Sequence, residues 1–227
     1  MSPPPRYPRI PHLAVSPAVT ADDAVLTPQE RARLLAADVV VEEKLDGMNV
    51  VIWIDDGVPR VGTRGGADTS DRSGERGRVR SWALTRADVL RDVLGDRYAL
   101  YAEWLRRRHA VAYDRLASEL VGFDVLDRVT REFLPVDARD SLLHEAGVVK
   151  PPRKFAGTLI SVEALDELLG ASSFGATRAE GVVVRSASTG VPRVAKHVDP
   201  AWRDVGRAAW AGENALGTVG APTRSSS

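Results

Sequence analysis

One lysine of the chain stands in a tetrapeptide whose residue types could carry out nucleophilic chemistry. The chain has four lysines and 27 arginines, and Lys44 opens the sequence Lys44-Leu45-Asp46-Gly47. An arginine side chain keeps its proton in proteins, whereas a lysine amine with a lowered pKa can attack an electrophile. We therefore take Lys44 as the candidate nucleophile, and we expect burial or neighbouring cations to lower its pKa.

The tetrapeptide by itself could also be a solvated strand end, because so short a pattern recurs by chance. It is followed by further short motifs. The series along the chain is Glu43-Lys44-Leu45-Asp46-Gly47, Thr63-Arg64-Gly65, Tyr101-Ala102-Glu103, Phe123-Asp124-Val125, Glu180-Gly181-Val182-Val183 and Ala195-Lys196. In this order the motifs resemble those of the covalent nucleotidyltransferases, which comprise polynucleotide ligases and capping enzymes. Asn49, in Gly47-Met48-Asn49, resembles the RNA ligase branch, as does the opening stretch from Tyr7 to Leu13.

This resemblance implies a role for each motif residue toward ATP. Lys44 would attack the α-phosphorus and carry AMP as a lysyl-adenylate, with Asp46 beside it and Glu43 at the purine edge. Phe123 would stack on the adenine, Glu103 would contact the ribose, and Lys196 would contact the α-phosphate. Asn49 and Arg64 would contact the phosphate of the adenylate or of the RNA end. Glu180 would belong to the shell of a Mg²⁺ or Mn²⁺ ion, which Glu103 would also contact directly or through water.

Several of these residues also have a structural interpretation. Phe123 in an apolar strand could be an ordinary core residue. Glu103 between Ala102 and Trp104 is harder to explain that way, because a carboxylate in an apolar strand is costly to bury unless something pairs with it. Glu180 at a strand edge is equally compatible with surface exposure. We expect His109 and Tyr113 to pack or to hydrogen-bond in a structural role, and we do not count either among the site residues.

The sequence departs from the family pattern at its last motif. Many ligases have a Lys-x-Lys pair there, but Val194 precedes Lys196 and Val198 follows it. Arg185 or Arg193 could supply the missing cation. About 30 residues follow Lys196, too few for the oligonucleotide-binding barrel of DNA ligases and capping enzymes, so we expect a catalytic domain alone.

The patterns around the motifs predict an α+β fold with mostly antiparallel sheets and flanking helices. Thr27-Pro28-Gln29-Glu30 has the form of a capping box with proline at the first helical position. Asp55-Asp56-Gly57 predicts a hairpin turn. The expected helices are 28–37, 79–94, 138–146, 162–169 and 200–211, the expected strands are 39–43, 49–55, 58–63, 98–105, 120–126, 181–185 and 191–196, and 65–77 is an expected loop.

We expect three parts along the chain. Six prolines between positions 3 and 17 predict an irregular, proline-rich amino-terminal arm over 1–24. The resemblance implies a nucleotidyltransferase domain, of the ATP-grasp-like ligase adenylation type, over 25–215. The serine-rich end predicts a flexible tail over 216–227.

Composition excludes several classes of site. The chain has no cysteine, so disulfides, thiolate zinc sites and cysteine nucleophiles are ruled out. Its 31 basic and 31 acidic residues give a net charge of zero, which does not favour tight sequence-independent binding to nucleic acid. Arginines do cluster within 72–80 and 106–108, where they could bind phosphates or be ordinary surface residues. The chain lacks a signal peptide pattern and a long apolar run, so we expect a cytoplasmic protein without membrane contact.

Together these observations predict an ATP-dependent RNA ligase that acts in RNA repair. It would bind RNA with a 5′-phosphate and a 3′-hydroxyl end, and a separate end-healing or specificity partner remains open. One alternative is a DNA ligase or capping-type guanylyltransferase that lacks its oligonucleotide-binding domain, against which Asn49 argues. Another is an inactive nucleotide- or RNA-binding module. The missing cation near Lys196 favours that module, whereas Lys44, Glu103 and Glu180 argue against it.

Overall fold

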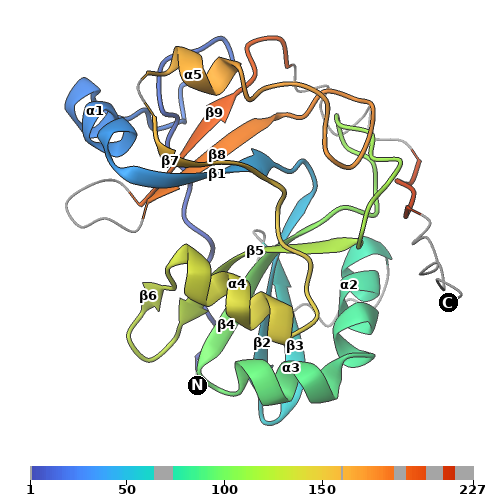
Figure 1. The fold of residues 1–227 in the computed structure, drawn as a ribbon. Coiled ribbons are helices and arrows are strands. Elements are labelled where there is room, and N and C mark those ends of the chain that lie inside the picture. Colours follow the sequence, from blue (N-terminus) through green and yellow to red (C-terminus); the bar gives the residue numbers. More distant parts are fainter. Residues whose placement is uncertain (1, 64–73, 160, 187–192, 203–211, 218–227) are drawn as a thin grey trace, which may run out of the picture.

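Two antiparallel sheets face one another across a cavity in the computed structural model, which describes residues 2–63, 74–159, 161–186, 193–202 and 212–217. The sheet that carries Lys44 lies in the upper half of Figure 1, and the sheet that carries Glu103 lies below it. The predicted α+β class with antiparallel sheets and flanking helices is confirmed. Among the described residues, no helix is long and apolar enough to span a membrane.

The first sheet has the strand order β7-β1-β8-β9. Its strands are β1 (Asp38–Lys44), β7 (Arg153–Thr158), β8 (Gly181–Ser186) and β9 (Val194–Val198). Helices α1 (Pro28–Ala36) and α5 (Glu163–Asp166) cover its outer face, where Val41 and Val184 are fully buried. Thr27 caps α1 through a capping box, as predicted from the sequence.

The second sheet has the strand order β3-β2-β4-β5-β6. Its strands are β2 (Met48–Asp55), β3 (Val58–Thr63), β4 (Tyr98–Trp104), β5 (Leu120–Asp127) and β6 (Glu132–Phe133). Helices α2 (Gly74–Leu84), α3 (Ala87–Leu94) and α4 (Val136–Glu145) pack on its outer face and bury Ile52 and Leu100.

Side-chain alternation on the strands decides which residues face the cavity. Because neighbouring residues of a strand point to opposite faces, burial of Val41 and Val184 on the outer face turns Glu42, Lys44 and Arg185 inward. In the second sheet, Asn49 pairs with Glu103, and both lie on the face opposite Ile52. The inner faces of the two sheets thus bring residues from both halves of the chain together.

The amino-terminal segment docks onto both sheets. Tyr7 is 5% exposed and packs against Tyr101 of the second sheet, with ring centroids 5.2 Å apart. Further along, the Leu13 N–H donates to the Lys196 carbonyl at 2.8 Å, so this segment extends the edge of the first sheet beside β9.

Four expected elements differ from the structure. The single helix expected over 79–94 is wrong, because α2 ends at Leu84 and α3 begins at Ala87. The Thr85 hydroxyl donates to the Trp82 carbonyl at 2.9 Å, which satisfies that carbonyl outside the helical pattern. Residues 74–77 of the expected loop begin α2, and only Glu163–Asp166 of the helix expected over 162–169 are α-helical. Among the described residues of the expected strand 191–196, β9 begins at Val194, and residues 191–192 lie outside the described residues.

Two strands were not expected. The edge strand β7 is half exposed and β6 has two residues, so neither carries an apolar alternation that the sequence could reveal. Residues 64–73 of the expected loop and 203–211 of the expected last helix lie outside the described residues.

Candidate active site

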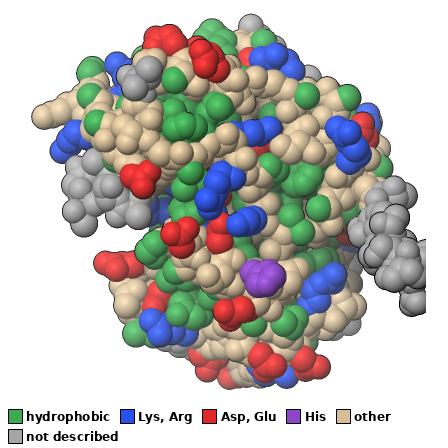
Figure 2. Space-filling view, in the orientation of Figure 1, with side chains coloured by type: hydrophobic (Ala, Val, Ile, Leu, Met, Phe, Trp, Pro, Cys, Tyr) green, Lys and Arg blue, Asp and Glu red, His purple; other side chains and the backbone are tan. Residues whose placement is uncertain are grey.

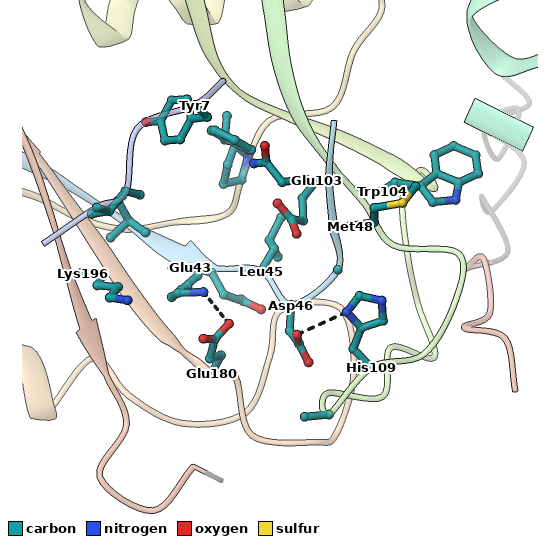
Figure 3. A pocket seen from close by; sticks show the side chains of 18 of the residues that line it. Tyr7, Glu43, Leu45, Asp46, Met48, Glu103, Trp104, His109, Glu180 and Lys196 are labelled. Atoms are coloured by element: carbon teal, nitrogen blue, oxygen red, sulfur yellow. Dashed lines mark hydrogen bonds and ion pairs between the residues drawn. The ribbon is translucent and has the colours of Figure 1, made fainter. Parts of the chain in front are cut away.

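Lys44 is the last residue of β1 and lines a cavity of about 850 Å³ between the two sheets. Its Nζ donates to Oε2 of Glu180 at 2.5 Å, the contact drawn as a dashed line in Figure 3. Lys44 pairs with Gly181 at the start of β8, so the backbone register places the residue before β8 beside the lysine. A Cβ at Gly181 would overlap the carbonyl of His197, so the glycine allows β8 and β9 to approach this closely.

The pKa of Lys44 is raised, so the expected lowering is wrong. Burial alone would lower the pKa, but the Glu180 carboxylate raises it, and Glu103 and Asp46 add to that effect. Lys44 is therefore held as an ammonium at neutral pH. It can act as a nucleophile only after its proton moves or the surrounding negative charge is compensated.

Three carboxylates crowd around this lysine, and their pKa values respond to one another. Burial raises the pKa of Glu103 to about 8; Lys44 opposes the rise, while Glu180 and Asp46 reinforce it. Burial also raises the pKa of Glu180, although the Lys44 ammonium opposes this. The acidic side chains at the site thus lie so close together and so deeply buried that Glu103 keeps its proton up to about pH 8.

Glu103 and Glu180 could hold a divalent cation. Mg²⁺ commonly takes one or two protein carboxylates and completes its coordination with water and substrate phosphates. In the part of the chain that the structure describes, no group of three or more His, Cys, Asp or Glu residues could hold a metal. The raised pKa values of Glu103 and Glu180 fit a two-carboxylate site, because a cation would relieve the repulsion that contributes to them.

Asp46 and Gly47 hold the turn after the lysine in a fixed shape. The Val111 N–H donates to Asp46 Oδ2 at 2.8 Å, His109 Nδ1 lies 3.6 Å from Oδ1, and the Asp46 N–H donates to the Tyr113 hydroxyl at 2.8 Å. Burial alone would raise the pKa of Asp46, but the hydrogen bonds from His109 and Val111 lower it. A Cβ at Gly47 would lie 2.5 Å from a backbone oxygen of β4, so only glycine lets the chain enter β2 there.

Glu43 lines the cavity, but its carboxylate is already bonded. Neighbouring residues of β1 point to opposite faces, so the Glu43 side chain leaves the strand on the other side from Lys44. Ser172 Oγ donates to Oε1 at 2.5 Å, the Ser173 N–H donates to Oε2 at 2.8 Å, and Lys154 Nζ lies 3.2 Å from Oε2. Contact with a purine edge stays a prediction.

Phe123 lines the cavity from a β-bulge of the second sheet. Tyr101 pairs with Asp124 and Ala102 with Gly122, so Phe123 is the extra residue between them. Bulges often re-aim a side chain next to a site. Tyr7 packs edge-on against Phe123, with ring centroids 4.9 Å apart at 81°. An adenine stack on this ring stays a prediction.

A second charged cluster, the inter-sheet brace, borders the cavity, which Glu42 and Arg185 line. It consists of Glu42, Asp124, Arg139, Arg185 and Arg193. Glu42 accepts from Arg139 on α4 and from Arg185 Nε at 2.8 Å, while Asp124 Oδ2 accepts from Arg185 at 3.1 Å and from Arg193 at 2.8 Å. Because Glu42 belongs to the first sheet and Asp124 to the second, these ion pairs tie the sheets together.

The remaining predicted residues divide into three cases. Lys196 of β9 lines the cavity, and its Nζ donates to Asp23 Oδ1 at 3.2 Å. Asn49 also lines the cavity and pairs with Glu103 across the strands. Arg64 lies outside the described residues, directly after Thr63, which lines the cavity.

The arginine clusters are partly neutralised. Arg78 and Arg106 both pair with Glu213, at 2.6 and 3.0 Å, while Arg76 lines the cavity and Arg72 lies outside the described residues. Figure 2 shows basic and acidic side chains next to one another where the upper and lower halves meet. A role of these arginines in binding RNA stays a prediction.

A family comparison agrees with this geometry. The sequence model described as RNA ligase matches residues 37–198, which is more than half of the chain and includes every motif from Lys44 to Lys196. The chain belongs to the RNA ligase family. A search of curated proteins finds no match.

Solved structures of a Naegleria gruberi RNA ligase share the fold. A mutant without ligand superposes with a TM-score of 0.64 at 18% identity, over 86% of this chain and 61% of that one. The same enzyme with pyrophosphate gives a TM-score of 0.63 at 18% identity and the same coverage. A mutant with ATP and manganese gives 0.60 at 16% identity, over 75% of this chain and 52% of that one. The chain therefore spans between half and three fifths of the length of these ligases.

The departure from the RNA ligase pattern has a definite location. Val194, where many ligases have a lysine, pairs directly with Arg185 in the register of β8 and β9. Arg185 projects from the same face as that missing lysine and lines the cavity, but it is ion-paired with Glu42 and Asp124. Arg193 is ion-paired with Asp124 as well. Substitution of either arginine for the lysine stays a prediction.

Sequence reasoning about the family motifs missed several residues of the site. Tyr7 and Ile10 line the cavity from the amino-terminal segment; the stretch from Tyr7 to Leu13 resembles the RNA ligase branch, but that resemblance did not place either residue in the site. Glu42 and its partner Arg139 carried a usable signal, because a carboxylate that continues the apolar strand from Val39 to Val41 must find a buried cation.

Proposed function

We propose that the chain is an ATP-dependent RNA ligase whose first step joins AMP to Lys44. The observation that carries this proposal is the position of Lys44 Nζ, which lies 2.5 Å from Glu180 in a cavity that Glu103 and Lys196 also line. Membership in the RNA ligase family supports the same reaction class. The structures of Naegleria gruberi RNA ligase mutants with ATP and manganese support the choice of nucleotide and of a divalent cation.

In the first step, Lys44 Nζ attacks the α-phosphorus of ATP. A phosphorus–nitrogen bond forms, the bond from the α-phosphorus to the bridging oxygen breaks, and pyrophosphate leaves with the electron pair. The lysine must first lose a proton, and Glu180 Oε2 is placed to accept it from Nζ. The raised pKa of Glu180 makes this carboxylate a better base than an exposed glutamate.

Residues from both sheets hold the nucleotide in this proposal. Lys196 neutralises charge on the α-phosphate, Phe123 stacks on the base, and Glu103 binds the ribose. Mg²⁺ or Mn²⁺ held by Glu103 and Glu180 would supply further positive charge against the phosphates. Asn49 and Arg64 contact the phosphate of the adenylate or of the RNA end.

The later steps follow the chemistry of the family. An oxygen of the RNA 5′-phosphate attacks the phosphorus of the lysyl-adenylate, the phosphorus–nitrogen bond breaks, and the Lys44 amine is released. The 3′-hydroxyl oxygen of the other RNA end then attacks the 5′-phosphorus, and AMP leaves as the phosphodiester forms. The net result is a sealed RNA strand at the expense of one ATP.

Intact-mass spectrometry after incubation with ATP and Mg²⁺ or Mn²⁺ tests the first step. We expect the mass of one added AMP on the wild type and none on Lys44→Ala. A Lys44→Arg variant is a matched control, because it keeps the positive charge beside Glu180 but cannot present an uncharged amine. We expect it to take no AMP either.

Other outcomes of this experiment would favour one of the alternative functions. No adduct with ATP, from folded protein shown not to be adenylylated already, would favour a nucleotide- or RNA-binding module. An adduct with GTP alone would favour a capping-type guanylyltransferase. If the adduct forms with ATP, sealing of matched nicked RNA and nicked DNA decides between the two ligase classes, and we expect the RNA nick to be sealed faster.

A further inference from the structure

The amino-terminal segment reaches the lysine assigned to the α-phosphate. Residues 11–13 run beside β9, where the Lys196 N–H donates to the Pro11 carbonyl at 2.9 Å and the Leu13 N–H donates to the Lys196 carbonyl at 2.8 Å. The chain then turns back, and His12 and Leu26 are joined by a backbone hydrogen bond of 2.9 Å. This return brings Asp23 to the Lys196 side chain.

The Asp23 carboxylate is fixed before it meets the lysine. Oδ2 accepts from the Thr20 hydroxyl at 2.8 Å and from the Thr20 N–H at 3.1 Å, and His12 Nε2 lies 3.6 Å from the same oxygen. Oδ1 is left to accept from Lys196 Nζ at 3.2 Å. Burial alone would raise the pKa of Asp23, but the Thr20 and Lys196 hydrogen bonds lower it, so the carboxylate is ionised at neutral pH.

This contact has two opposite consequences for phosphate binding. A lysine ammonium is a point charge on a flexible stem with three N–H donors, so one fixed acceptor orients it and leaves two donors for another partner. The same carboxylate also cancels part of the charge that would attract an anion. Arg185 on the same sheet face also lines the cavity, but its charge is already paired with Glu42 and Asp124. Binding of an anion at this part of the cavity wall therefore depends mainly on the charge of Lys196.

We propose that Asp23 is a positioning residue for Lys196, which directs the ammonium toward the α-phosphate and at the same time weakens the binding of ATP. This inference rests on the proposed function. Asp23 thus lowers the affinity for ATP but holds the Lys196 ammonium in the orientation that AMP transfer needs.

An Asp23→Asn variant separates the two consequences, because it keeps the shape of the side chain and removes its charge. ATP affinity is measured with Mg²⁺ by calorimetry in a Lys44→Met background, where AMP transfer cannot occur. The rate of AMP transfer is measured in single turnovers at saturating ATP with Lys44 intact. We expect ATP to bind about three- to tenfold more tightly and transfer to be about tenfold slower.

Asp22→Asn is the matched control, since it removes the same charge from the adjacent, exposed side chain. We expect it to change neither quantity by more than about twofold. Thr20→Val keeps the Asp23 charge but loosens its anchor, so we expect slower transfer without tighter binding.

A merely structural role for Asp23 would weaken ATP binding and slow transfer together, and that result would overturn the proposal. Equal effects of Asp23→Asn and Asp22→Asn would overturn it too. Failure of the proposed function gives a different result, in which the wild type takes no AMP although Lys44→Met binds ATP. In that case the affinity comparison alone decides the role of Asp23, and unchanged affinity rejects it.

Discussion

Glu42 of the inter-sheet brace and Lys44 of the candidate site lie two residues apart on the same face of β1, but the two residues have opposite electrostatic surroundings. In the brace, Glu42 and Asp124 lie among arginines, which keep their protons. At the site, Lys44 lies among carboxylates, and the pKa values of Glu103 and Glu180 are raised. The brace is therefore a permanently charged structural tie, whereas Glu103 and Glu180 at the site can change their protonation.

This difference explains why the two clusters lie side by side without sharing a function. A site that must bring a lysine, several carboxylates and a nucleotide together needs two sheets held at a constant separation. Buried arginine–carboxylate pairs supply that separation, because removing one partner leaves a buried charge uncompensated. Mutations in the brace should therefore lower the stability of the protein, whereas mutations at the site should change how its stability depends on pH.

The largest effect on stability is expected from the brace. Arg139 is 1% exposed and donates to Glu42, Asp140 and the Phe123 carbonyl. Arg139→Met leaves the Glu42 carboxylate with one cation fewer, and we expect the free energy of unfolding to fall by about 3 kcal/mol. Urea denaturation monitored by circular dichroism measures this change.

Two controls sharpen that prediction. Arg115→Met removes an exposed arginine from its ion pair with Asp114, which is exposed as well, and should leave the unfolding midpoint nearly unchanged. Adding Glu42→Gln to Arg139→Met removes the uncompensated charge and should restore part of the lost stability. If the Arg139 and Arg115 variants have the same stability, the brace is not a structural tie.

A smaller, pH-dependent effect is expected at Glu103. Its pKa is raised from 4.5 to about 8, so the folded protein keeps a proton there that the unfolded chain has already lost. The wild type therefore loses stability as pH rises between these two values. Glu103→Gln lacks this proton, so its stability relative to wild type should rise with pH and reach a gain on the order of 1 to 2 kcal/mol near pH 8.

Denaturation midpoints measured at several pH values test this expectation. Glu132→Gln, which changes an exposed carboxylate on β6, is the control and should follow the wild-type profile. A Glu103→Gln profile parallel to that of the wild type would mean that Glu103 is ionised in the folded protein. The proposed crowding of carboxylates around Lys44 would then be wrong.

The smallest effect is expected at Tyr113, which supports the site without carrying its charge. Its hydroxyl accepts from the Asp46 N–H at 2.8 Å, and the ring is 1% exposed. Tyr113→Phe leaves that N–H without this acceptor, so we expect a loss of about 1 kcal/mol in unfolding free energy and slower AMP transfer. Tyr98→Phe at the start of β4 is the matched control, for which transfer should be unchanged.

Much of the fold could be predicted from local patterns. The capping box at Thr27 marks the start of α1, and the hairpin of β2 and β3 turns at Asp55-Asp56-Gly57. These features depend on a few neighbouring residues, so the sequence reveals them directly. The edge strand β7 could not be predicted in this way, because pairing with β1 rather than an apolar alternation makes it a strand.

The candidate site shows the same division. Lys44, Asp46, Glu103, Phe123, Glu180 and Lys196 were identified from motifs, and all of them line the cavity. The pKa of Lys44 was predicted with the wrong sign, because the sequence does not show how many carboxylates surround the amine or how near they lie. Charge interactions depend on distance and burial, which only the folded chain determines.

The sequence by itself determined the family, the α+β class and the identity of the lysine, because residue types in a fixed order carry that information. Tertiary structure alone decided the partners of that lysine, the joining of Glu42 to Arg139, and the approach of Asp23 to Lys196. Each of these contacts joins residues far apart along the chain. Its geometry arises from the packing of two sheets and a docked amino-terminal segment, and no local sequence pattern records such packing.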